Sequence, residues 1–252
     1  MTYKCLMLDV DGTLSSYSST SLPEMPSDEV VEAINRAKAT VFVGLATSRP
    51  LFKVQPILER LQLDGYSILH NGALIVNSKT LEIIEQQALP SESLPMLYDI
   101  AMRYQIPTYY SNFRQNYLLE SMEQITSIPV ANIFYDGIEP GNIEQIDHEL
   151  GQINDIMAHH LISRQENKFE RSVTHVDATK QNAIEKVAQL LGIRTQDIIG
   201  VGDGPNDIPL LRACGLKVAM GNAVEELKAI ADMIAPSVEE NGVVTIIDQF
   251  WG

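Results

Sequence analysis

The sequence predicts an α/β protein: a doubly wound, Rossmann-like core of parallel strands with a smaller α+β domain inserted into it. Short apolar runs alternate with amphipathic helical segments in the first 78 residues and again after residue 176, which is the pattern of a parallel sheet covered on both faces. Residues 79–176 are more polar and mix helical with strand-like segments. We therefore predict a core formed by residues 1–78 and 177–252 and an inserted cap domain at residues 79–176.

The first half of the core is expected to run strand, helix, strand, helix, strand. The buried strands are expected at residues 5–8, 41–45 and 66–69, which are short apolar runs. Ser27 is placed to cap a helix over residues 27–38, and Pro50 suits the first position of the next helix. Residues 15–26 are rich in Ser, Tyr and Pro and are expected to form a loop.

The remaining elements divide into a mixed middle and a return to the core pattern. In the middle, helices are expected at residues 91–105 and 141–157, and strands at residues 108–110, 117–119, 159–163 and 172–176. His159 and His160 are expected on its surface. After it, helices are expected at residues 179–191, 208–213, 221–230 and 242–250, and strands at residues 197–201, 216–219 and 233–235. Because short apolar strands return between helices, the middle is interpreted as an insertion.

Charge and composition exclude several classes of partner. The formal net charge of −15 argues against nucleic acid and anionic membranes, because both bind basic surfaces. No apolar run approaches the ~18 residues of a membrane span, and no signal-peptide pattern precedes Asp9. Cys5 and Cys214 form no disulfide framework or metal motif. We predict a cytoplasmic protein with a small-molecule partner; the sequence gives no indication of its oligomeric state.

Two carboxylates, Asp9 and Asp11, follow the first predicted strand. In an extended segment, side chains two residues apart share a face, and open α/β sheets bind ligands at the carboxyl ends of their strands. Two carboxylates there repel each other unless a cation lies between them or one of them takes a proton. On this segment alone, a capping Asp followed by a turn Asp before Gly12 is an equally good interpretation.

Polar side chains also follow the other predicted core strands. They are Thr47, Ser48 and Arg49, then Asn71, then Asp203, Asn206 and Asp207, with Lys180 in the helix after the insertion. Oxygen ligands without clustered His or Cys favour Mg²⁺, and an ammonium group with backbone donors binds phosphate. A carboxylate beside such a site can attack phosphorus. Singly, Thr47 as a helix cap, Arg49 in a salt bridge and Asn71 in a turn remain open alternatives.

Taken together and in this order, these segments resemble the motifs of the haloacid dehalogenase-like superfamily, in its Cof-type phosphatase branch, which has an inserted α/β cap. The matching segments are residues 9–14, residues 46–50, Lys180 and residues 202–207, with residues 71–73 and 221–223 also similar to this branch. Ser48 and Gln181 stand where the family usually has glycine. Neither departure removes a charged group, so they bear on substrate detail rather than on activity.

The resemblance implies roles for these residues. Asp9 would be the nucleophile that takes the phosphoryl group, and Asp11 the general acid and base. Mg²⁺ would be held by Asp9, the backbone carbonyl of Asp11 and Asp203. The phosphate and the substrate would be bound by Gly12, Thr47, Ser48, Asn71, Lys180 and Asn206, with Asp207 and Arg49 as supporting residues. Asn206 and Asp207 would lie beside the metal or orient Lys180.

The activity implied by the resemblance is Mg²⁺-dependent hydrolysis of small phosphorylated metabolites, with sugar phosphates as the expected substrates. Two alternatives share the same motifs. A phosphosugar mutase would return the phosphoryl group to the sugar, and a catalytically inactive binding protein would keep the fold without the reaction. Substrate contacts are expected in the cap, where the chemically plausible residues are Tyr109, Tyr110, Arg114 and Arg164.

Overall fold

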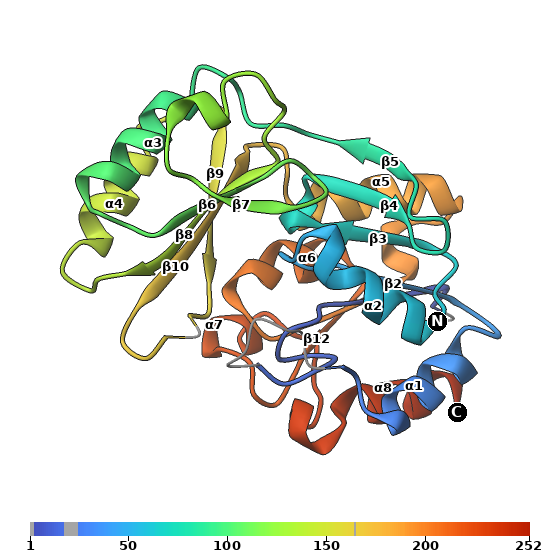
Figure 1. The fold of residues 1–252 in the computed structure, drawn as a ribbon. Helices are drawn as coiled ribbons and strands as arrows, with labels where there is room; N and C mark the ends of the chain where they lie inside the picture. The colour runs from blue at the N-terminus through green and yellow to red at the C-terminus, as the bar shows by residue number, and fades with distance from the viewer. Residues whose placement is uncertain (1–2, 18–24, 164) are drawn as a thin grey trace.

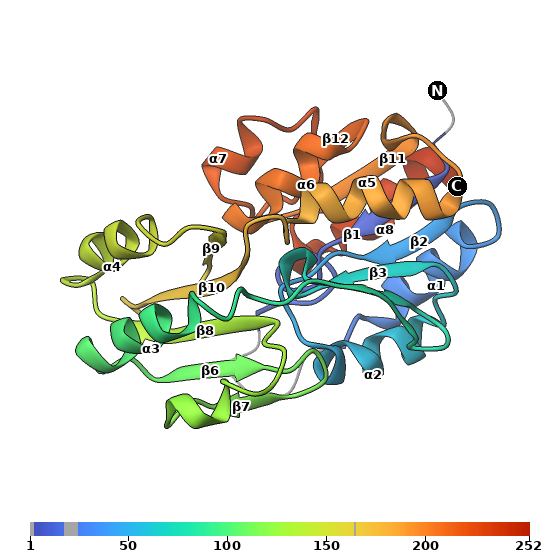
Figure 2. The ribbon, with the colours of Figure 1, turned by 90° about the horizontal axis from the view of Figure 1, so that it is seen from above.

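Two sheet-and-helix bodies make up the computed structural model, which describes residues 3–17, 25–163 and 165–252. Arg164 and residues 18–24 of the predicted loop lie outside the described residues. One body is a parallel five-stranded sheet with helices on both faces, and the other is an antiparallel five-stranded sheet (Figures 1 and 2). The predicted fold class is confirmed.

The core sheet has the strand order β13-β12-β11-β1-β2, and all its pairings are parallel. Its strands are β1 (Cys5–Leu8), β2 (Phe42–Leu45), β11 (Ile198–Gly202), β12 (Leu216–Ala219) and β13 (Met233–Ile234). Side chains of β1 alternate between two hydrophobic clusters: Leu6 and Leu8 belong to one, Cys5 and Met7 to the other. This period of two places β1 at the centre of a sheet buried on both faces.

Helices cover each face of the core sheet, as Figure 2 shows. One face carries α1 (Asp28–Ala37), α2 (Leu51–Leu61) and α8 (Gly242–Trp251), and the other carries α5 (Lys180–Leu191) and α6 (Ile208–Ala213). Ser27 caps α1 as predicted, since its side chain accepts a hydrogen bond from the Val30 N–H. Pro50 is the N-cap of α2 rather than its first residue. A short helix, α7 (Glu225–Lys228), replaces the longer one predicted at residues 221–230.

The third predicted strand pairs differently from the expectation. β3 (Tyr66–Leu69) forms an antiparallel hairpin with β4 (Leu74–Asn77), which pairs in turn with β5 (Ile83–Gln86). A single parallel bridge between Ala46 and Ile68 joins this small sheet to the core. The chain can reverse so soon because Asn71 and Gly72 adopt positive φ angles. β5 lies past residue 79, the predicted start of the cap; the domain boundaries remain predictions.

The antiparallel sheet has the order β7-β6-β8-β10-β9. Its strands are β6 (Thr108–Ser111), β7 (Asn116–Leu118), β8 (Asn132–Ile138), β9 (Ile156–Leu161) and β10 (Phe169–His175), and its helices are α3 (Leu94–Arg103) and α4 (Ile143–Leu150). Both helices pack on one face, where Leu97, Ile133 and Tyr135 share a hydrophobic cluster (Figure 1). The opposite face of the sheet lies toward the core and lines a cavity together with core residues.

Two predictions for this region are wrong in detail. The helix predicted at residues 141–157 ends at Leu150, because Gly151 caps it and the sequence then takes up strand spacing in β9. The central strand β8 was not predicted. Asn132, Asp136 and Gly137 interrupt the apolar residues of β8, so its sequence is a weaker strand signal than the apolar runs of the core strands.

Short 3₁₀ turns complete the fold: η1 (His70–Gly72), η2 (Met122–Gln124), η3 (Thr195–Asp197), η4 (Pro205–Asp207) and η5 (Val238–Glu240). Among the described residues, no helix has both the length and the apolar character to cross a membrane.

The two chain crossings between the bodies lie side by side. The Gln87 Nε2 atom and the His175 Nδ1 atom are 2.9 Å apart, which links the segment before α3 to the end of β10. Gly72, with φ of 120°, lies against the backbone of Thr179, the N-cap of α5. A Cβ atom at Gly72 would lie 2.4 Å from the Thr179 carbonyl oxygen.

Gly72→Ala is therefore expected to lower the free energy of unfolding by about 2 kcal/mol or more, because both the φ angle and the contact with Thr179 are strained. Urea unfolding followed by circular dichroism measures the change. Gly141→Ala is the matched control, since nothing lies within 4 Å of a Cβ atom there, and should change stability by less than ~0.5 kcal/mol. Equal effects of the two substitutions would contradict the close packing at Gly72.

Candidate active site

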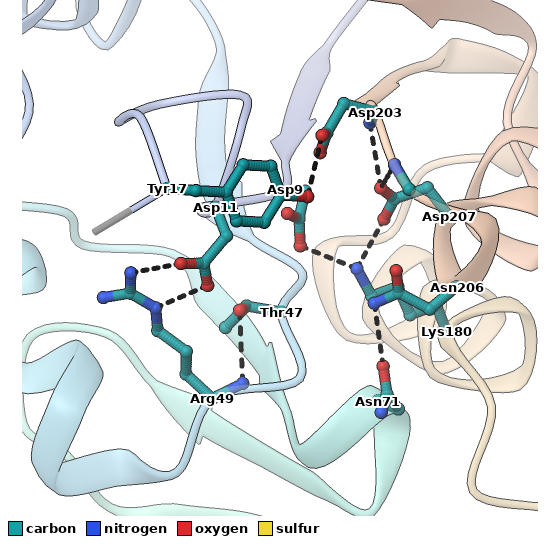
Figure 3. Close-up of polar contacts among 11 residues, drawn as sticks. Asp9, Asp11, Tyr17, Thr47, Arg49, Asn71, Lys180, Asp203, Asn206 and Asp207 are labelled. Carbon is teal, nitrogen blue, oxygen red and sulfur yellow. Dashed lines mark hydrogen bonds and ion pairs between the residues drawn. The ribbon is translucent and has the colours of Figure 1, made fainter. Parts of the chain in front are cut away.

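A buried lysine lies between two carboxylates at the carboxyl end of the core sheet (Figure 3). Lys180 is the first residue of α5 and is 1% exposed. Its Nζ atom donates to Asp9 Oδ1 at 2.7 Å and to Asp207 Oδ1 at 2.5 Å. A cation in the first turn of a helix opposes the helix dipole, so its position here depends on the two carboxylates.

Asp207 is itself held in place by the backbone that follows β11. Its Oδ2 atom accepts hydrogen bonds from the Asp203 N–H at 3.0 Å and the Gly204 N–H at 2.9 Å. The turn η4 ends at Asp207 and brings the side chain back over the end of the strand. Asp207 therefore connects the loop that carries Asp203 to Lys180, which is one of the two positions predicted for it.

Three buried carboxylates gather around this lysine. Asp9, Asp203 and Asp207 each offer an oxygen, and these oxygens all lie within 4.8 Å of one another. Lys180 supplies one positive charge against three negative ones, and Asp203 Oδ1 is buried without a hydrogen-bond partner. Hard oxygen donors with uncompensated negative charge fit a divalent cation. The predicted ligand set contained Asp9 and Asp203; the structure adds Asp207 to the cluster.

Burial and mutual repulsion of the carboxylates in this cluster shift their pKa values. Burial, and then the charge of Asp207, raises the pKa of Asp9 from 3.8 to about 8. Burial, and then the charges of Asp207 and Asp9, raises the pKa of Asp203 to about 9. Burial alone would lower the pKa of Lys180, but Asp207 and Asp9 outweigh it and raise that pKa above its ordinary value. A bound cation would favour the ionised carboxylates.

Asp11 points away from this cluster, toward Arg49. The guanidinium is 4% exposed and donates from Nε to Asp11 Oδ2 at 2.7 Å and from Nη2 to Asp11 Oδ1 at 2.5 Å (Figure 3). A two-bond pair of this kind fixes the plane of the carboxylate. The structure therefore separates the two neighbouring aspartates: Asp9 faces Lys180, and Asp11 faces Arg49.

The remaining predicted residues lie around the same point. Thr47 is fully buried, and its Oγ1 atom accepts from the Arg49 N–H at 3.2 Å. Asn206 Nδ2 donates to Asn71 Oδ1 at 3.2 Å, so the loop after β11 touches the turn after β3. Ser48 lines the cavity above the site. All the predicted site residues thus come from the carboxyl ends of strands and the start of α5.

Gly12 is required beside this cluster. Its φ angle is 72°, and a Cβ atom there would lie 2.1 Å from Asp203 Oδ2. The Gly12 carbonyl accepts a hydrogen bond from Asn222 Nδ2 at 2.9 Å, and Asn222 Oδ1 accepts from the Val238 N–H at 3.0 Å. Asn222 lies in a segment that the family resemblance marked without giving it a role.

Tyr17 is a site residue that the sequence reasoning missed. Its hydroxyl donates to Asp203 Oδ2 at 2.8 Å, and its ring lines the cavity (Figure 3). Burial, and then the charge of Asp203, raises the pKa of the Tyr17 phenol above its ordinary value. Tyr17 lies in a polar loop with no recognisable motif, so only the fold shows that it reaches Asp203.

A cavity of about 460 Å³ lies above Asp9 and is lined by residues of both the core and the antiparallel sheet. The cap side of its wall contains Tyr109, Asn116, Asn132, Phe134, Asp136, Leu161, Ile162, Gln165, Glu170 and Ser172. Of the predicted substrate contacts, Tyr109 lines this cavity. Tyr110 instead stacks on Tyr117 with ring centroids 5.3 Å apart, Arg114 is not among the lining residues, and Arg164 lies outside the described residues.

Two buried histidines border the junction between the bodies. His159 was predicted on the surface, but it is buried and its Nε2 atom lies 2.8 Å from Thr174 Oγ1; His160 is exposed as predicted. Burial, and then the nearby Lys180 charge, lowers the pKa of His159 to about 3. His70 is fully buried, lines the cavity and has its pKa lowered to about 4 by burial. Both imidazoles are neutral at pH 7.

Comparison with known proteins gives one consistent result. A family model described as haloacid dehalogenase-like hydrolase matches residues 6–247. The putative phosphatase YxeH of Bacillus subtilis is 28% identical over 98% of each chain. A second Bacillus subtilis protein, 5-amino-6-(5-phospho-D-ribitylamino)uracil phosphatase YcsE, is 28% identical over 97% of this chain and 94% of its own. A solved haloacid dehalogenase-like hydrolase from Bacteroides thetaiotaomicron has a TM-score of 0.82 at 23% identity, and covers 98% of this chain and 99% of its own.

The raised pKa values of Asp9 and Asp203 predict how cation binding depends on pH. Without a cation, the folded protein keeps protons that the unfolded chain releases above its ordinary Asp pKa, so stability falls as pH rises toward 8. A divalent cation replaces those protons and should therefore raise the melting temperature more at pH 8 than at pH 5. Thermal unfolding with and without a chelator at the two pH values measures this rise in melting temperature. Asp203→Asn should reduce the rise. A rise that is the same at pH 5 and pH 8 would contradict the proposed linkage.

Proposed function

The chain belongs to the haloacid dehalogenase-like hydrolases and is a phosphatase, and from this premise we propose that it hydrolyses phosphate esters of small metabolites through an aspartyl-phosphate. Sugar phosphates are the proposed substrates, Asp9 is the nucleophile, and Mg²⁺ is the cation. The observation that carries the proposal is the buried contact of Lys180 with Asp9 and Asp207 at the base of a cavity.

In the first step, a carboxylate oxygen of Asp9 attacks phosphorus and the bond from phosphorus to the ester oxygen breaks. The leaving alkoxide needs a proton near neutral pH, and we assign this donation to Asp11. Lys180 offsets the charge that the transition state spreads over the phosphate oxygens, and Thr47 donates a hydrogen bond to one of them. Arg49 holds Asp11 in position through its two hydrogen bonds.

In the second step, water attacks the phosphorus of the aspartyl-phosphate. Asp11 takes the proton from the water, and the bond from phosphorus to the Asp9 oxygen breaks, which frees inorganic phosphate and restores the carboxylate. Mg²⁺, held by Asp9, Asp203 and the Asp11 carbonyl, with Asp207 beside it, would supply charge neutralisation for the phosphate and the carboxylates. The unpartnered Asp203 Oδ1 atom supports this ligand set.

The cap side of the cavity would contact the leaving group of the substrate. Tyr109 and Phe134, with ring centroids 6.5 Å apart, line it together with amide side chains. Asp9 and Lys180 are buried at the base of this cavity, and burial strengthens the electrostatic contacts between them. The relative named for a phosphoribitylamino-uracil supports a phosphorylated polyol as the kind of molecule that this cavity receives.

A phosphosugar mutase with the same nucleophile is the alternative activity. It would transfer the phosphoryl group from Asp9 to a second hydroxyl of the sugar instead of to water. Release of inorganic phosphate without isomerised product favours the hydrolase. A binding protein without activity is separated from both by fluoroberyllate with Mg²⁺, which mimics the aspartyl-phosphate and should raise the melting temperature of an active enzyme.

Asp9→Asn is expected to lower kcat for p-nitrophenyl phosphate by about 10⁴-fold or more, because the amide is a poor nucleophile toward phosphorus. Phosphate release in the presence of Mg²⁺ measures it. Asp99→Asn, on the exposed side of α3, makes the same chemical change far from the cavity and should leave kcat within about twofold, in line with other surface substitutions. Retention of most activity by Asp9→Asn would refute the nucleophile assignment.

Removal of the cation should abolish turnover. Dialysis against a chelator leaves three carboxylates against one lysine at Asp9, so the phosphate would enter a site with excess negative charge. Phosphate release should stop after dialysis and return when Mg²⁺ is added. An enzyme that works at full rate in excess chelator would exclude the metal part of the proposal.

A further inference from the structure

Buried polar atoms without hydrogen-bond partners gather at one place in the described structure. Eight buried side-chain atoms lack a partner, and the residues that carry four of them line the cavity above Asp9. These four atoms are Arg49 Nη1, His70 Nδ1, Asn116 Oδ1 and Asn132 Oδ1. A buried polar atom costs free energy unless it is hydrogen-bonded, so their concentration around one cavity points to a ligand that completes them.

Asn132 is the best defined of the four. It lies on β8, is 5% exposed, and its Nδ2 atom donates to Ser172 Oγ of β10 at 3.2 Å. The Oδ1 atom has no partner. Since the Ser172 hydroxyl can donate or accept, either orientation of the amide leaves one polar atom of Asn132 unsatisfied in the cavity.

His70 occupies the wall formed by the core. Its ring is fully buried, and its Nε2 atom lies 3.2 Å from Ser111 Oγ of β6, which joins the core to the cap. The other ring nitrogen, Nδ1, has no partner. Ser111 and Asn132 face each other in the register of β6 and β8, so His70 and Asn132 flank the same corner of the cavity.

Alternate residues of β8 form the face of the antiparallel sheet that lines the cavity. Asn132, Phe134 and Asp136 alternate along β8 and all line the cavity, whereas Ile133 and Tyr135 between them belong to the hydrophobic cluster under α3 and α4. Side chains two residues apart share a face of a strand. This strand therefore presents an amide, an aromatic ring and a carboxylate to the cavity from a rigid support.

We propose that Asn132 and His70 form a leaving-group subsite. It would bind the hydroxyl groups of a phosphate ester whose leaving group is an uncharged polyol. The inference rests on the proposed phosphatase activity and assigns its specificity. A hydroxyl group both donates and accepts, so it can satisfy an amide and a neutral imidazole in either orientation. A leaving group without hydroxyls would leave both of them unsatisfied, and this kind of mismatch gives strong discrimination.

The subsite also disfavours a leaving group with a second negative charge. Among the described cap residues that line the cavity there is no Lys or Arg, and Asp136 and Glu170 add carboxylates. The cationic lining residues, Arg49 and Lys53, come from the core, and Arg49 is bound to Asp11. An anion beside Asn132 would have no positive partner among these described cap residues, so its desolvation would not be offset by them.

The test compares ribitol 5-phosphate, 5-phosphoribonate and p-nitrophenyl phosphate. The first two have the same chain length and differ in a terminal hydroxymethyl or carboxylate group, and the third has no hydroxyl group to bind. The wild-type enzyme should have a kcat/KM for ribitol 5-phosphate at least about tenfold above that for 5-phosphoribonate. Asn132→Ala should lower kcat/KM for ribitol 5-phosphate by about tenfold and leave p-nitrophenyl phosphate within about twofold.

Asn142→Ala is the matched control, because Asn142 lies on the cap outside this cavity and its side chain makes no capping hydrogen bond to α4. This variant should leave kcat/KM unchanged for both ribitol 5-phosphate and p-nitrophenyl phosphate. Circular dichroism reports folding, and Asn132→Ser replaces the alanine variant if the alanine variant is unfolded. Equal loss on ribitol 5-phosphate and p-nitrophenyl phosphate by a folded variant, or equal use of the polyol and the carboxylate ester, would overturn the subsite. No hydrolysis of any ester by the wild-type enzyme would overturn the proposed function, and the subsite with it.

Discussion

The site depends on one lysine that is buried among three carboxylates. Lys180 contacts Asp9 and Asp207 directly, and Asp203 completes the cluster. Buried charges of this kind are stable only when they are paired and hydrogen-bonded, so the backbone around them has little freedom. The bonds from the Asp203 and Gly204 N–H groups to Asp207, and the capping of α5 by Thr179, both serve to keep this arrangement.

The same constraint explains how two neighbouring aspartates come to lie in different surroundings. Asp9 and Asp11 are two residues apart, yet Asp9 faces an ammonium group in a buried cluster and Asp11 faces a guanidinium at the edge of the cavity. A nucleophile and a proton carrier, which are the roles proposed for Asp9 and Asp11, need different surroundings. Lys180 and Arg49, which are distant from each other in the sequence, make the surroundings of the two aspartates different.

Much of the core and of the site could be predicted from the sequence, because both rest on local patterns. The apolar runs that become β1, β2 and β11 end directly in Asp9, Thr47 and Asp203, so the carboxyl ends of the strands identify the site. The cap was harder, because β8 carries a mixed polar pattern and the sequence after Leu150 suits a helix or a strand equally well. The burial of His159 and the contact of Tyr17 with Asp203 depend on residues that are separated in the chain, and no local signal encodes them. The hairpin of β3 and β4 does have a local signal, because Asn71 and Gly72 lie between its two strands, but the apolar run at residues 66–69 is also typical of a parallel core strand.

The most direct measurement traps the phosphorylated residue during turnover. Rapid acid quench followed by borohydride reduction converts a phosphorylated aspartate to homoserine, and peptide mass spectrometry locates it. The account predicts homoserine in place of Asp9, with Asp11, Asp203 and Asp207 unchanged. Homoserine in place of one of those three, or none at all while phosphate is being released, would contradict it.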